Sequence, residues 1–132
     1  MTVGMIQGKI PMKGSTTLVP VARALQAALT VLVIEAPDAL RFLAPRPDGQ
    51  AVVLTQMRML SAQMLDTVRP DAIVGPLITS EWDIVDLGIA LESLGYSGDL
   101  YALTQPLPRA ELVVREVGAV CPRLTVHLLE TT

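Results

Sequence analysis

The sequence predicts an α/β protein, a three-layer α/β/α sandwich built on a five-stranded parallel sheet. Short apolar runs rich in β-branched residues alternate with stretches of helical periodicity along the whole chain. One run, residues 72–78, is apolar at nearly every position and is bounded by polar residues on both sides. Such a run is typical of a strand buried on both faces in the middle of a parallel sheet. A composition of 51% hydrophobic and 17% charged residues agrees with a sheet that helices cover.

The expected elements follow from periodicity and from turn residues. Residues 1–16 carry three glycines and no steady period, so we expect a flexible arm there and a single domain over residues 17–132. The expected strands are residues 31–35, 50–55, 72–78, 100–104 and 123–129. The expected helices are residues 17–29, 38–44, 57–68, 84–94 and 109–117.

Right-handed crossovers between these strands favour the sheet order 2-1-3-4-5 of flavodoxin-like proteins. No helix is expected after the fifth strand, so the last helix of such a fold is missing. The N-terminal helix, residues 17–29, is a candidate to cover that strand, either in its own subunit or by exchange with a second one. An uncovered apolar face tends to become an interface between proteins.

Composition excludes several classes of partner. The net charge is −3, aromatic residues make up 3%, and no basic stripe is visible, which argues against nucleic-acid binding. The uncharged stretch 24–34 is too short to span a membrane. A single cysteine, Cys121, fits a reducing, cytoplasmic location. A signal peptide with Lys9 and Lys13 ahead of its apolar part is an alternative, but cleavage near Ala36 would remove the strand 31–35.

The residues that follow the central strands are the candidates for function, because ligands of parallel sheets bind at the carboxyl ends of the strands. The candidate interface or ligand contacts are Ser80, Glu81, Trp82, Asp83, Gln105 and Pro106. Trp82 is either a partner anchor or a plug of the crevice. No nucleophile with a neighbouring base, phosphate-binding loop or paired-histidine motif is visible. We therefore expect no catalytic residue, no cofactor and no metal.

Three other features favour structural roles. His127 lies within an expected strand without a second histidine, so a structural role is favoured over metal binding. Cys121 lacks a neighbouring histidine, which argues against redox chemistry. The methionines of the helix 57–68 favour core filling over an adaptable binding surface.

The order of these elements resembles the receiver domain of two-component response regulators over residues 31–129. The segment VLVIE at 31–35 looks like the first receiver strand, which normally ends in an acidic pair. The segment RPDAIVGP at 69–76 looks like the third strand, whose phosphate-accepting aspartate would stand where this chain has Pro76. Thr104 matches the switch hydroxyl of the family, although a threonine at a strand end is also ordinary β-strand chemistry.

Departures from the family decide what the resemblance implies about function. Glu35 is followed by Ala36, so only half of the acidic pair is kept, and Pro76 has no carboxylate to accept a phosphoryl group. The lysine that the family carries after its fifth strand is absent near residues 127–130. Glu35, Pro76 and Thr104 would then be a vestigial receiver site.

The resemblance implies a degenerate receiver, a non-catalytic signalling module that docks another signalling or regulatory protein or a second copy of itself. The alternative is a flavodoxin-like domain that binds a small molecule in the crevice at the strand ends.

Overall fold

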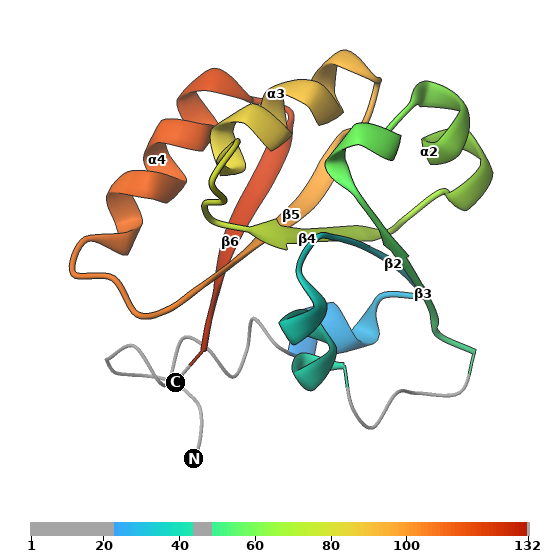
Figure 1. Cartoon of the computed structure of the whole chain (residues 1–132), viewed down its shortest axis with the longest axis horizontal. Helices are drawn as coiled ribbons and strands as arrows, with labels where there is room; N and C mark the ends of the chain where they lie inside the picture. The colour runs from blue at the N-terminus through green and yellow to red at the C-terminus, as the bar shows by residue number, and fades with distance from the viewer. Residues whose placement is uncertain (1–22, 44–48, 132) are drawn as a thin grey trace.

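The computed structural model describes residues 23–43 and 49–131 (Figure 1). These residues form one parallel sheet of five strands in the order β3-β2-β4-β5-β6. In chain order this is 2-1-3-4-5, so the expected topology is confirmed. The strands are β2 (Thr30–Ile34), β3 (Ala51–Thr55), β4 (Ala72–Pro76), β5 (Gly98–Thr104) and β6 (Leu124–Glu130).

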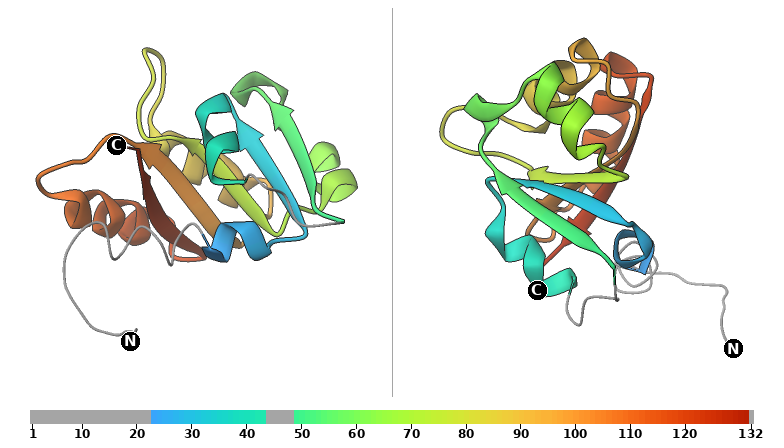
Figure 2. Two further views of the ribbon diagram at one scale, coloured as in Figure 1. Left: turned by 90° about the horizontal axis from the view of Figure 1, so that it is seen from below. Right: turned by 90° about the vertical axis from the view of Figure 1, so that its right-hand side faces the viewer.

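Helices lie on both faces of the sheet, as the sequence predicts. Three α-helices cover one face: α2 (Ala62–Val68), α3 (Ile84–Ser93) and α4 (Ala110–Val120) (Figure 1). On the other face lie the short 3-10 helix η1 (Pro37–Phe42) and the helical residues 23–27 (Figures 1 and 2). The architecture is therefore a flavodoxin-like α/β fold with one thick and one thin helical layer.

Two hydrophobic clusters hold these layers, because successive strand residues point to opposite faces of the sheet. Ile73 and Leu100 pack towards α3 and α4, whereas their neighbours Val74 and Tyr101 pack towards η1. All four side chains are buried. The near-continuous apolar run of β4 is thus explained by burial on both faces.

Gly75 allows α3 to approach the central strand. A Cβ atom built at this position would lie 2.5 Å from Cδ2 of Leu87, a fully buried side chain of α3. The position therefore favours glycine for lack of space.

Several element boundaries differ from the expectation, and three of the differences have a clear local cause. The expected helix 57–68 is divided into the 3-10 turn η2 (Met57–Met59) and α2, because the Ser61 hydroxyl accepts a hydrogen bond from the amide of Met64 at 3.0 Å and starts a new helix. Gly118 was expected to end the last helix, but α4 continues to Val120. The expected turn 97–99 is shorter, since Gly98, with φ of 143°, already belongs to β5.

Some expectations fall on other parts of the chain. The flexible arm 1–16, the beginning of the helix 17–29 and its role as a cover for the last strand lie outside the described residues. Within residues 23–43 and 49–131, no helix follows β6, and no helix is long and apolar enough to cross a membrane.

Candidate functional site

The carboxyl ends of three neighbouring strands meet at one edge of the sheet. Val33 of β2 is paired with Val74 of β4, and the two strands end close to this pair, β2 at Ile34 just before Glu35 and β4 at Pro76. Pro76 is in turn paired with Leu103, the residue before Thr104. The structure therefore brings the three residues of the predicted vestigial site to adjacent strand ends.

Glu35 is occupied by a structural role. Its backbone has a left-handed φ of 52°, an uncommon conformation for a residue other than glycine. The turn directs the carboxylate towards the end of β3, where Oε2 accepts a hydrogen bond from the amide of Met57 at 2.7 Å. The amide of Glu35 donates to the carbonyl of Thr55 at 3.0 Å. Glu35 thus ties the ends of β2 and β3 together.

The other two residues of the predicted vestigial site, Pro76 and Thr104, also have structural surroundings. Pro76 has neither a backbone N–H nor a polar side chain to offer at the tip of β4. The Thr104 hydroxyl donates to the carbonyl of Gln105 at 2.9 Å, and the Thr104 carbonyl accepts from the amide of Thr131 at 2.8 Å. The Thr104 hydroxyl is therefore used in a local hydrogen bond to the next residue.

The loop between β4 and α3 is a compact hairpin with its own hydrogen bonds. The Thr79 hydroxyl accepts from the amide of Trp82 at 2.9 Å and donates to its carbonyl at 2.9 Å. Asp83 precedes α3 as its N-cap in a capping box. Its Oδ1 accepts from the amide of Asp86, and Oδ2 of Asp86 accepts from the amide of Asp83, both at 3.0 Å. Ile78 stays 72% exposed. The loop presents an apolar side chain on a rigid support.

A first hollow, the β2–β3 hollow, lies between this loop and the ends of β2 and β3. Its volume is about 400 Å³. Half-buried Trp82 forms one wall of the hollow and also packs against the core. Two acidic residues, Glu35 and Glu81, and one basic residue, Arg58, also line the hollow. Arg58 donates from Nε to Oε1 of Gln56 at 2.8 Å. The hollow thus combines an aromatic wall with charges of both signs.

A second hollow, the β4–β5 hollow, has a volume of about 370 Å³ on the other side of β4. Thr104 and Gln105 line it together with apolar Leu77, Ile78 and Leu103. Asp38 and Thr131 complete its wall.

The predicted contacts are therefore divided between two hollows. Glu81 and Trp82 belong to the β2–β3 hollow, and Gln105 belongs to the β4–β5 hollow. Ser80 and Pro106 are exposed and line neither hollow, while Asp83 caps α3.

Sequence reasoning missed some lining residues of both hollows. Gln56 and Arg58 lie one and three residues after the expected strand 50–55, so their position at a strand end was a usable signal. Asp38 and Thr131 likewise follow the expected strands 31–35 and 123–129 by three and two residues, but only the tertiary structure brings them together beside β4 and β5.

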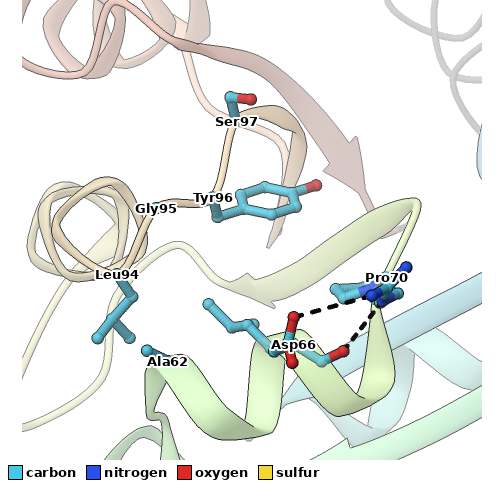
Figure 3. Close-up of a pocket in the computed structure, with 9 residues that line it drawn as sticks. Ala62, Asp66, Pro70, Leu94, Gly95, Tyr96 and Ser97 are labelled. Atoms are coloured by element: carbon cyan, nitrogen blue, oxygen red, sulfur yellow. Dashed lines mark hydrogen bonds and ion pairs between the residues drawn. The ribbon is translucent and has the colours of Figure 1, made fainter.

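A third hollow of about 480 Å³ lies at the opposite, amino-terminal edge of the sheet, between α2 and the segment joining α3 to β5 (Figure 3). Its aromatic residue is Tyr96, whose hydroxyl donates to the carbonyl of Asp99 at 2.7 Å. Burial and then the charge of Asp99 raise the pKa of Tyr96. Asp66 and Arg69 are exposed and contact each other at 4.0 Å. Tyr96, Asp66 and Arg69 thus already have interaction partners within the protein.

The remaining candidates have structural surroundings. Nε2 of His127 lies 2.9 Å from Oδ1 of Asp99, and its ring stacks on Tyr101 with centroids 4.7 Å apart. Cys121 is fully buried, and burial followed by the charge of Glu92 raises the pKa of its thiol. The favoured structural reading of both residues thus has a physical basis.

The methionines of the segment 57–68 divide between the core and the surface. Met57 and Met64 pack against the main core cluster, whereas Met59 is 54% exposed. Core filling therefore describes two of the three.

No protein-family model matches this chain, and no curated protein matches it. The class of protein is therefore defined by the fold, a flavodoxin-like α/β domain with two open hollows at the carboxyl edge. Within the described part of the chain, no group of three or more histidine, cysteine, aspartate or glutamate side chains is placed to hold a metal ion. The carboxyl edge of the sheet therefore offers a binding partner hollows, the aromatic side chain of Trp82 and hydrogen-bonding groups.

Proposed function

We propose that this protein is a non-catalytic, receiver-like regulatory domain that works by docking a signalling or regulatory protein at the carboxyl edge of its sheet. One observation carries the proposal. At the place where phosphoryl chemistry would need free carboxylates, Pro76 forms the tip of β4 and the carboxylate of Glu35 is engaged with the amide of Met57 at 2.7 Å. Because these residues hold the backbone of the strand ends in place, the carboxyl edge gives a partner a fixed surface.

The surface itself supports docking. Ile78 stands 72% exposed on the hydrogen-bonded hairpin, with exposed Ser80 and Glu81 beside it. Gln105 and Pro106 form a second exposed segment, directly after the carboxyl end of β5. An apolar centre with a polar rim on a rigid loop is the arrangement that protein interfaces favour.

The first experiment tests the absence of phosphoryl chemistry. Beryllofluoride with magnesium, an analogue of the aspartyl phosphate, is added to labelled protein, and amide spectra are recorded. We expect the amides of Leu77 and Thr104 to keep their positions, because no carboxylate at the tip of β4 can accept the analogue. Large shifts at both residues would overturn the proposal.

The second experiment tests the docking surface. Binding to each protein that the neighbouring genes encode is measured for Ile78→Asp and for Ile89→Asp, a matched change at a residue of α3 that is 48% exposed. We expect Ile78→Asp to weaken binding by about tenfold or more and Ile89→Asp to leave it unchanged. Equal binding by the two variants would refute a docking role for the carboxyl edge.

The β2–β3 hollow favours a second candidate, the binding of a small molecule. A flat or cationic group could lie against the indole of Trp82, while Glu35 and Glu81 accept hydrogen bonds from it. Trp82 is the only tryptophan, so tryptophan fluorescence reports on the surroundings of this one side chain, which include the hollow. Nucleotides and cationic metabolites are titrated with fluorescence and the melting temperature as readouts. A ligand that raises the melting temperature but leaves the fluorescence of Trp82 unchanged would exclude this hollow.

A further inference from the structure

The edge strand β3 exposes backbone and apolar side chains together. Among residues 23–43 and 49–131, it pairs with β2 on one side only and is the last strand of the sheet (Figure 2, right). Leu54 is 58% exposed and Ala51 is exposed as well. Proteins usually protect such edges with charges, proline or bulges, because an open apolar edge pairs with other strands.

The sequence of this strand carries none of these protections. Residues 49–57 contain no charged residue and no proline. The opposite edge strand differs, since β6 contains His127, begins after Arg123 and ends at Glu130. The open edge at β3 is therefore a specific feature of one side of the sheet.

The hydrogen bonds of β3 show which of its backbone groups are free. The amide of Ala51 donates to the carbonyl of Leu29 at 2.8 Å, and the carbonyl of Thr55 accepts from the amide of Glu35 at 3.0 Å. In a parallel pair, the backbone groups of alternate residues bond to the neighbouring strand. The N–H and C=O groups of Val53 therefore also point towards β2. The N–H and C=O groups of Val52 and Leu54 consequently point away from the sheet.

We propose that a second copy of this chain pairs with β3 in antiparallel orientation, around a two-fold axis at Val53. In this register Val52 of each copy faces Leu54 of the other, and both residues present their free N–H and C=O groups, as a hydrogen-bonded antiparallel pair requires. Val53 faces its own counterpart in a pair without hydrogen bonds. The two sheets then continue as one.

Side chains agree with this register. Paired residues of an antiparallel ladder lie on the same face, so the exposed Leu54 is covered by the partner's Val52 on the face of η1. Val52 already packs against the cluster on that face. Because the strand is uncharged, its self-pairing brings no like charges together. The inference concerns a different edge from the proposed docking site and does not depend on it.

The main experiment measures the oligomeric state of the full chain by sedimentation over a range of concentrations. We expect a monomer–dimer equilibrium for the wild type. Leu54→Lys should raise the dimer dissociation constant by at least about tenfold, because lysine on an edge strand opposes pairing. The matched change Leu112→Lys, at a residue of α4 that is 42% exposed, should not alter it. A wild type that is monomeric at every concentration would overturn the proposal, as would equal effects of the two changes.

A crosslinking experiment tests the register. Residues that face each other in a pair without hydrogen bonds have Cα atoms about 4.5 Å apart, which permits a disulfide. Val53→Cys in a Cys121→Ala background should therefore form a covalent dimer on mild oxidation. Leu54→Cys in the same background should form much less, since it faces Val52 of the partner. Circular dichroism of both variants verifies that they fold, and crosslinking at 54 in preference to 53 would refute the register.

An extended peptide from another protein is the competing occupant of this edge. It would protect the outward amides of Val52 and Leu54 from hydrogen exchange only when that protein is added. Protection that rises with the concentration of the chain alone supports the dimer, and its absence contradicts it.

Discussion

At the scale of single residues, Asp71 holds the start of two central strands. Its Oδ2 accepts hydrogen bonds from the amides of Leu29 and Thr30, at 3.1 and 3.0 Å. We expect Asp71→Ala to lower the free energy of unfolding by about 1–2 kcal/mol, because both amides lose a charged acceptor. Asp66→Ala is the control, since Asp66 is 81% exposed and only 4.0 Å from Arg69. Urea unfolding measures both, and equal losses would contradict this role.

The contact between Gly75 and α3 gives a second residue-scale prediction. Gly75→Ala should destabilise the protein by about 1–3 kcal/mol, since the new Cβ would lie 2.5 Å from Cδ2 of Leu87. Leu87→Ala leaves a cavity and should cost about 2–5 kcal/mol by itself.

Because the shortened side chain makes room for the new methyl group, the double variant should lose less stability than the sum of the single changes. A thermodynamic cycle from urea unfolding checks the coupling. Additive losses of stability would show that the short contact at residue 75 is relieved by movement of atoms other than those of Leu87.

At the scale of elements, α2 depends on Ser61, the N-cap residue that precedes it. It is a short helix of 7 residues, and the Ser61 hydroxyl accepts from the amide of Met64 at 3.0 Å. Ser61→Ala should therefore cost about 1 kcal/mol. Thr67→Ala, an exposed change within the same helix, should cost nothing or stabilise slightly. Thermal unfolding of the two variants distinguishes a capping effect from a general effect of alanine.

At the scale of the whole molecule, two tyrosines link stability to alkaline pH. Burial is the main cause that raises the pKa of Tyr96 and of Tyr101, followed for both by the charge of Asp99. A tyrosine in an unfolded chain ionises near about pH 10. The folded state favours the neutral form of both hydroxyls, so this stabilisation is complete below that pH and is lost as the pH rises above it.

Tyr96→Phe isolates one contribution. At pH 7 the variant should be about 1 kcal/mol less stable, since the hydrogen bond to the carbonyl of Asp99 is lost. Above pH 10 its stability should fall less steeply than that of the wild type, while Tyr101 maintains part of the slope. Urea unfolding between pH 8 and pH 11 is the measurement, and an unchanged slope would contradict the role of Tyr96.

The candidate site was predictable only in part. Glu81, Trp82 and Gln105 were found because the carboxyl ends of parallel strands share one edge, and Glu35 and Pro76 were named through the resemblance to receiver domains. Their grouping was not found, because it depends on the left-handed turn at Glu35 and on the hairpin held by Thr79. The surface distribution of Met57 and Met59 likewise depends on the break before Ser61.

The sequence by itself determined the alternation of strands and helices, the order of the sheet and the burial of its central strand. The alternation and the burial follow from hydrophobic periodicity, which is local and is repeated along each element, and the order follows from the handedness of the crossovers. Only the tertiary structure decided that the predicted contacts divide between two hollows and that β3 presents free backbone groups at Val52 and Leu54. Such features depend on single turn conformations and on contacts between distant segments, and hydrophobic periodicity encodes neither.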